Sequence, residues 1–148
     1  AESFDPTRID AWALGEKYGM SMIGDFNAGT VGWTDWNVLL DETGGPNHVG
    51  NFCFAPLIVD TKAGKLLYTN AYYYIGHFSK FIRPGARRVA ATANRDVLQT
   101  TAFRNPDGSV AVVVMNQTDK PLDYQLWIAG QAAKTTAAAH SIMTLVVQ

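Results

Sequence analysis

The spacing of hydrophobic residues changes at Pro84-Gly85, and this change divides the chain into two unlike halves. Before it, apolar residues recur at helical spacing; after it, they alternate with a period of two, which indicates strands. The expected strands cover residues 86–92, 97–104, 109–116, 122–128, 131–136 and 140–147. Short strands separated by turn residues such as Asn105-Pro-Asp-Gly108 are typical of an antiparallel β-sandwich. We therefore predict an α+β chain with units at 1–83 and 84–148.

The first half has two helical patterns and one strand pattern. Residues 9–27 and 72–82 each carry apolar side chains at steps of three or four, which predicts two helices. Between them, residues 30–36 place Trp33 on one strand face and Trp36 on the other. Large aromatics on both faces predict a central strand that is buried on both sides. Residues 57–60 and 65–68 are short apolar runs, of which the second is either a partner strand or a connection.

A long stretch without periodicity, residues 37–56, follows the predicted strand. Irregular loops of this length are uncommon in compact domains and are often functional. Trp36 and Asn37 lie at its start, and Asn51 lies near its end. Tryptophan stacks on the apolar face of a sugar, and amides bond its hydroxyls, so these residues are candidates for substrate binding. The alternative is that Trp36 is a core aromatic of the strand.

Asp35 and Glu42 are the carboxylates nearest this candidate site, and they are the candidates for catalysis. A retaining glycosidase needs two carboxyl groups about 5–5.5 Å apart, and an inverting one needs them about 6.5–9.5 Å apart. The alternative is that both carboxylates cap turns and solvate the loop.

Composition excludes several other classes of protein. Twelve basic and thirteen acidic residues give a net charge of −1, so we expect no nucleic-acid partner. The three histidines and single cysteine lack metal-ligand spacing, and Gly44-Gly45 lacks the context of a phosphate loop, so we predict neither a metal nor a cofactor. No apolar run is long enough for a membrane span, and the compartment stays open.

Several motifs resemble the C-terminal section of glycoside hydrolase family 30, which includes glucosylceramidases, related β-glucosidases and xylanases. The resemblance covers nearly the whole chain and rests on Gly32-Trp-Thr-Asp-Trp-Asn37, Gly44-Gly-Pro-Asn47, Asn51-Phe52, Ala55-Pro56, Asp60, Gly76-His-Phe-Ser-Lys-Phe-Ile82, Pro84-Gly85 and Asn105-Pro-Asp-Gly-Ser109, with residues 112–116.

The resemblance implies that the first half is the end of a (β/α)₈ barrel and that the second half belongs to its β-sandwich. It implies hydrolysis of β-glucosidic bonds with retention, with Trp36, Asn51 and Phe52 lining the glucose subsite. The family's two catalytic glutamates lie on the fourth and seventh barrel strands, which this chain does not match; Asp35 reads there as structural. The alternative function is a non-catalytic, sugar-binding or structural piece of a larger hydrolase.

The resemblance also implies an incomplete barrel, because the eighth strand, residues 30–36, would lack both of its strand neighbours. Unpaired strand edges and exposed aromatics favour association. We therefore expect a homo-oligomer, or association with the missing barrel portion. The expected ligand is a β-glucoside or a related carbohydrate.

Overall fold

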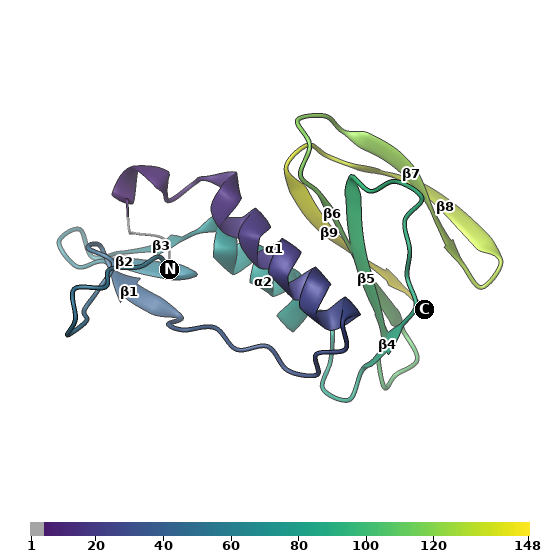
Figure 1. The fold of residues 1–148 in the computed structure, drawn as a ribbon, viewed down its shortest axis with the longest axis horizontal. Helices are drawn as coiled ribbons and strands as arrows, with labels where there is room; N and C mark the ends of the chain where they lie inside the picture. Colours follow the sequence, from purple (N-terminus) through teal and green to yellow (C-terminus); the bar gives the residue numbers. More distant parts are fainter. Residues whose placement is uncertain (1–4) are drawn as a thin grey trace.

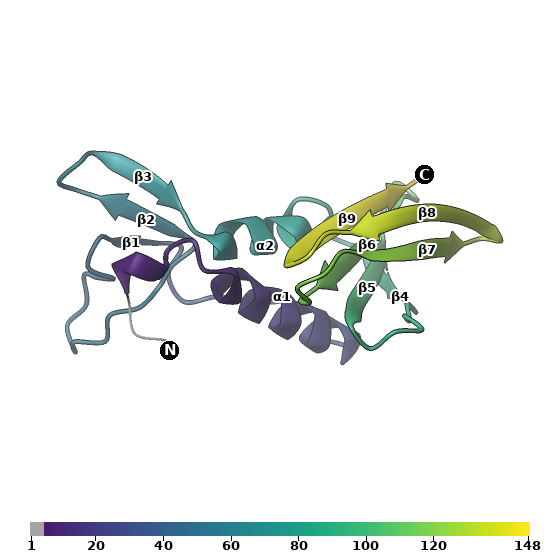
Figure 2. The same cartoon turned by 90° about the horizontal axis from the view of Figure 1, so that it is seen from above.

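The computed structural model describes residues 5–148 and places two central helices between a small sheet and a strand-rich lobe (Figure 1). A 3₁₀ turn, Pro6–Arg8, precedes α1, Trp12–Asn27, and α2 covers Asn70–Ser79. The view in Figure 2 keeps the same order, with the helices between the two groups of strands. Both predicted helices are therefore present, although the second begins and ends slightly earlier than its pattern indicated.

The small sheet has the order β1-β2-β3 and belongs to the first half of the chain. Its strands are β1, Leu39–Asp41, β2, Leu57–Asp60, and β3, Lys65–Tyr68. β1 runs parallel to β2, and β3 is antiparallel to β2, so residues 65–68 form the partner strand. Leu40, Cys53, Ala55 and Ile58 form its buried cluster.

The second lobe contains one four-stranded sheet and one hairpin. The sheet has the order β4-β5-β6-β9, all antiparallel, and β7 pairs with β8. Their bounds are β4 Arg87–Val89, β5 Leu98–Arg104, β6 Val110–Asn116, β7 Leu122–Ile128, β8 Gln131–Ala137 and β9 Ser141–Val147. The predicted α+β fold class, with an antiparallel sandwich in the second half, is confirmed.

β6 joins the layers because both of its faces are buried. Val113 and Met115 pack with Tyr74 and Phe78 of α2 in one cluster. Val112 and Val114 point to the other face, where they pack under the β7–β8 hairpin. Side chains alternate across a strand, so one strand supplies both cores and holds the helices to the sandwich lobe.

The prediction of a central strand at residues 30–36 is wrong. These residues form no strand, and the first strand is β1, which lies inside the predicted irregular loop. They run as an extended segment back beneath α1 toward β1 (Figure 1). A strand needs a hydrogen-bonded neighbour, and no strand within the described residues 5–148 pairs with this segment. Val31 and Trp36 are consequently exposed, at 103% and 83%, rather than buried.

Candidate functional site

Two side-chain hydrogen bonds tie the extended segment 30–36 to α1. The Tyr18 hydroxyl donates to Oδ2 of Asp35 at 2.8 Å, and the Trp33 indole donates to Oδ2 of Asp25 at 3.0 Å. Burial and the bond to Asp35 raise the pKa of Tyr18, so its hydroxyl remains a donor across the neutral range. Side chains of α1 therefore position this segment in place of strand pairing.

The two tryptophans of the segment point to different surroundings. Trp33 is partly buried against the cluster between the helices, with the Tyr18 ring edge-on at 5.8 Å between centroids. Trp36 is exposed and has a free indole face. Trp33 therefore contributes to the core, whereas Trp36 is exposed to solvent.

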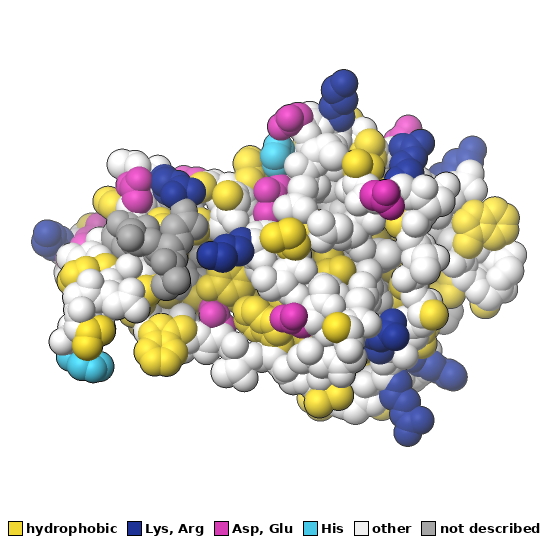
Figure 3. Space-filling view, viewed as in Figure 1, with side chains coloured by type: hydrophobic (Ala, Val, Ile, Leu, Met, Phe, Trp, Pro, Cys, Tyr) yellow, Lys and Arg dark blue, Asp and Glu magenta, His cyan; other side chains and the backbone are white. Residues whose placement is uncertain are grey.

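A hollow of about 880 Å³ opens between this segment and α2. Its lining is Trp33, Asp35, Trp36, Val38, Pro56, Tyr72, Tyr73, Ile75, Gly76, His77, Ser79, Lys80 and Phe81. The volume lies within the usual range of small-molecule sites, about 300–1,000 Å³. Figure 3 shows hydrophobic side chains at the surface between the small sheet and the sandwich lobe. An aromatic wall with a few polar groups suits a ligand that has both apolar faces and hydroxyls.

The structure brings only part of the predicted site to this hollow. Asp35 and Trp36 line it, whereas Asn37, Asn51 and Phe52 are exposed residues outside its lining. The Asn51 backbone donates to Oδ1 of Asn47 at 2.9 Å, which fixes the loop but leaves the Asn51 amide nitrogen at the surface.

Sequence reasoning did not assign the opposite wall of the hollow, which comes from α2. Tyr72 and Tyr73 are 42% and 55% exposed, and their rings pack edge-on at 5.4 Å. Three consecutive tyrosines at 72–74 were the available signal. In a helix, two of them must leave the buried face that Tyr74 occupies.

Glu42, one of the two catalytic candidates, is hydrogen-bonded to Thr61 in the turn between β2 and β3. Its carboxylate accepts hydrogen bonds from the Thr61 backbone and hydroxyl, each at 3.0 Å. The Thr61 backbone bond is the main cause that lowers the pKa of Glu42. A general acid needs a raised pKa, so this environment suits a structural carboxylate rather than a proton donor.

Asp35 borders the hollow, but the Tyr18 hydroxyl occupies one of its oxygens. Among residues 5–148, no group of three or more His, Cys, Asp and Glu side chains could hold a metal ion. Neither helix in that range is long and apolar enough to cross a membrane.

A second groove of about 910 Å³ lies in the sandwich lobe, between the β5–β6 face and β7. Aliphatic residues such as Leu98, Val112 and Leu126 dominate its lining. It carries no cluster of catalytic side chains, so the hollow beside Trp36 is the better functional candidate.

Comparison with known proteins decides the family. Residues 2–82 match the glycosyl hydrolase family 30 TIM-barrel domain, and residues 85–145 match the family 30 beta sandwich domain. The chain belongs to glycosyl hydrolase family 30. The extended segment 30–36 and both helices therefore lie in the region that matches the family's barrel domain, and the strands from β4 onward lie in its sandwich domain.

Two family relatives illustrate the extent of the match. The lysosomal acid glucosylceramidase of Mus musculus is 43% identical over 118 residues, which cover 78% of this chain and 23% of that protein. Putative glucosylceramidase 4 of Caenorhabditis elegans is 31% identical over 96% of this chain and 28% of its own length. The chain thus spans about a quarter of the curated relatives that it matches.

Solved structures extend the likeness to the fold. SrfJ from Salmonella typhimurium superimposes with a TM-score of 0.89 at 34% identity, over 100% of this chain and 33% of that one. The endo-β1,6-glucanase BT3312 gives a TM-score of 0.79 at 25% identity, over 88% of this chain and 30% of its own. A family 30 xylanase C from Talaromyces cellulolyticus, at 17% identity, shares the fold with a TM-score of 0.76.

Proposed function

We propose that this chain forms the sugar-binding wall and the β-sandwich of a family 30 glycosidase that hydrolyses β-glucosides with retention. The observation that carries the proposal is Trp36, an 83% exposed indole at the edge of an aromatic hollow. Contact between this large apolar face and water is unfavourable, and stacking on the apolar face of a sugar ring would bury it. The relatives named as glucosylceramidases support a β-glucoside as the ligand.

Asn51 is the proposed polar partner of Trp36, with Phe52 and Asn37 as neighbouring contacts. Its amide can donate to one sugar hydroxyl and accept from another. The loop that carries it is fixed by Asn47, whose side chain accepts hydrogen bonds from the backbone of Val49 and Asn51.

The chemistry itself needs two carboxyl groups, and we propose that neither Asp35 nor Glu42 supplies them. Both carboxylates accept hydrogen bonds from residues of the same chain. The resemblance places the two catalytic glutamates on barrel strands that this sequence does not match. In this proposal the chain binds and positions sugar, and it hydrolyses sugar only together with those strands.

This proposal and a non-catalytic, sugar-binding role predict the same behaviour for the purified chain. We expect it to bind an aryl β-glucoside without hydrolysing it. Turnover that disappears in Asp35→Asn or Glu42→Gln would instead assign the chemistry to these carboxylates. Turnover that survives both changes in the folded protein would place the chemistry elsewhere. Absence of binding would favour a purely structural role.

We also propose that the chain associates, either with a second copy of itself or with the other strands of a family 30 barrel. The support is the exposed backbone of segment 30–36, which has no strand neighbour within residues 5–148. Light scattering at high concentration tests this proposal. A uniform species of 16.1 kDa would contradict self-association.

A further inference from the structure

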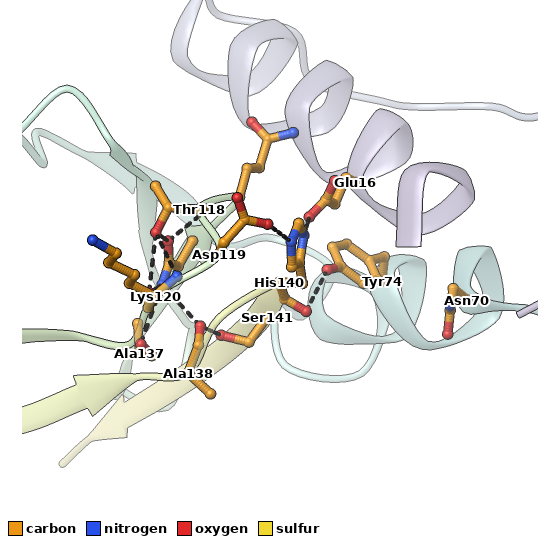
Figure 4. A network of polar contacts seen from close by, with 12 residues as sticks. Glu16, Asn70, Tyr74, Thr118, Asp119, Lys120, Ala137, Ala138, His140 and Ser141 are labelled. Carbon is orange, nitrogen blue, oxygen red and sulfur yellow. Dashed lines mark hydrogen bonds and ion pairs between the residues drawn. The ribbon is translucent and has the colours of Figure 1, made fainter. Parts of the chain in front are cut away.

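His140 lies where three parts of the fold meet, just before β9 begins. Its Nδ1 is 2.8 Å from Oε1 of Glu16, which comes from α1 in the first half of the chain. Its Nε2 is 2.8 Å from Oδ1 of Asp119, which comes from the turn between β6 and β7. Figure 4 shows the ring between these two carboxylates.

Both bonds require a proton on the ring nitrogen. An ionised carboxylate can only accept hydrogen bonds, so each ring nitrogen must be a donor. Neutral imidazole has one N–H, and only the imidazolium form has two. We propose that His140 is a pH-sensitive clamp between α1 and the sandwich lobe, closed when the imidazole carries both protons and weakened when it loses one.

The backbone and the ring of His140 are both held in place, as a clamp requires. Its φ is 47°, in the left-handed region that residues other than glycine rarely adopt. The Trp12 ring stacks on the imidazole, with centroids 6.3 Å apart and an interplanar angle of 13°. The Tyr74 hydroxyl of α2 donates to the His140 carbonyl oxygen at 3.4 Å. Strain that persists at one residue is a reason to look for a role there.

The two carboxylates differ in how much water screens them. The Glu16 side chain is 13% exposed and that of Asp119 is 94%, whereas His140 lies between them at 29%. Screening weakens exposed ion pairs, so the bond to Glu16 contributes most of the coupling. That bond is also the one that crosses from α1 to the sandwich lobe.

Four other ionisable groups surround His140, and one of them is a tyrosine of α2. From α2, Tyr74 faces it, and burial followed by the nearby charge of Glu16 raises the pKa of Tyr74 to about 12. From the turn, Lys120 directs its amino group away from the ring in Figure 4. Together with Glu16 of α1 and Asp119 of the turn, these are the groups that face the clamp. Histidine is the residue type among these whose ordinary pKa lies near neutrality, so we assign the pH effect to His140.

The direction of the pH effect follows from the sign of the shift. The hydrogen bonds to Asp119 and Glu16 raise the pKa of His140 above its ordinary value of 6.5. The folded chain therefore holds this proton more tightly than the unfolded chain. The stabilisation is fully present below pH 6.5 and is lost as the pH rises through the raised pKa.

An NMR titration of the imidazole resonances in the whole chain is the first test. We expect His140 to titrate above 6.5 and its pKa to fall in Glu16→Gln. The wild-type titration needs no variant to fold. A pKa at or below 6.5, or one that Glu16→Gln leaves unchanged, would overturn the clamp.

A double-mutant cycle tests whether the clamp couples the two halves. His140→Asn removes the charge and keeps a residue that tolerates the left-handed conformation. At about pH 5.5, Glu16→Gln and His140→Asn should each lower the urea midpoint, and the double variant should fall no further. At about pH 8.5 the Glu16→Gln change should have little effect. Equal coupling at both pH values would contradict the proposal.

His48→Asn is the matched control. His48 is an exposed loop residue, and its side chain makes no hydrogen bond within residues 5–148. This variant should leave the difference in urea midpoint between the two pH values unchanged. If it removes the difference as His140→Asn does, the pH effect does not arise at the clamp.

Discussion

Gly15 of α1 lies directly against the aromatic ring of Tyr74 in α2. A Cβ atom at Gly15 would overlap three ring carbons, and one at Gly19 would lie 3.0 Å from Cδ1 of the same ring. The two glycines, one helical turn apart, form the flat surface on which the buried tyrosine rests. Their low helix propensity is thus offset by the close approach of the two helices.

Alanine at Gly15 should therefore destabilise the chain. We expect Gly15→Ala to lower the free energy of unfolding by about 1–3 kcal/mol, because the ring or the helix must move. Gly24→Ala is the control in the same helix, since a Cβ there meets nothing within 4 Å. It should stabilise by about 1 kcal/mol through helix propensity alone. Urea denaturation measures both; equal effects would contradict the packing.

Asn105 joins the end of α2 to the β5–β6 turn and should be hard to replace. Its side chain is buried, donates to the Phe81 carbonyl and the Ser109 hydroxyl, and accepts from the Arg83 backbone. Asn105→Ala leaves these buried and partly buried groups without their partner, so we expect a loss of about 1–3 kcal/mol in unfolding free energy.

Asn94→Ala is the control for Asn105→Ala, because Asn94 is exposed and no hydrogen bond of its side chain is recorded among the described residues. It should change the unfolding free energy by less than about 0.5 kcal/mol. Comparable losses in the two variants would mean that the Asn105 contacts do not stabilise the fold.

His77 should give a pH dependence of the opposite sign to His140. It lies against β9, with Nδ1 3.0 Å from the Thr144 hydroxyl oxygen, and burial lowers its pKa below 6.5. The folded state then binds fewer protons than the unfolded state, so stability falls as the pH drops below 6.5. We expect His77→Gln to remove this loss on acidification. Denaturation midpoints at two pH values check it, and an unchanged difference would refute it.

Tyr18 should contribute to stability through Asp35. Tyr18→Phe removes the hydroxyl that donates to Asp35, so we expect a loss of about 0.5–1.5 kcal/mol in unfolding free energy. Tyr73→Phe is the matched control, since Tyr73 is 55% exposed and no hydrogen bond of its hydroxyl is recorded within residues 5–148. Thermal denaturation distinguishes them; if the Tyr73 change costs as much, the Asp35 contact is not the cause.

The sandwich strands were predictable because their determinants are local. In β6 and its partner strands, side chains alternate between the two faces of the sheet along the whole strand. The turn residues Asn105-Pro-Asp-Gly108 then connect β5 to β6. The two helices were predictable for the same reason, since their apolar spacing and the stop at Gly29, where φ is 101°, are sequence-local.

The state of residues 30–36 was not predictable from the chain, because a strand depends on partners far away in sequence. The apolar pattern is that of a buried strand, yet within residues 5–148 no partner strand reaches it. The same limit applies to His140 and Glu16, which are 124 residues apart and meet only after folding. Trp36 was selected from sequence, whereas the α2 wall of its hollow was missed, although the three consecutive tyrosines at 72–74 offered a signal.

The measurement that tests the central proposal most directly is an NMR titration of the tryptophan indoles with an alkyl β-glucoside. Trp127 supplies an internal control, because it is 68% exposed and lies on β7, away from the hollow. We expect the Trp36 indole to shift, the Trp127 indole to stay unchanged, and Trp36→Ala to weaken binding by at least about tenfold while Trp127→Ala does not. A glucoside that shifts neither indole, or that binds equally well to the folded Trp36→Ala protein, would contradict the proposed sugar-binding wall.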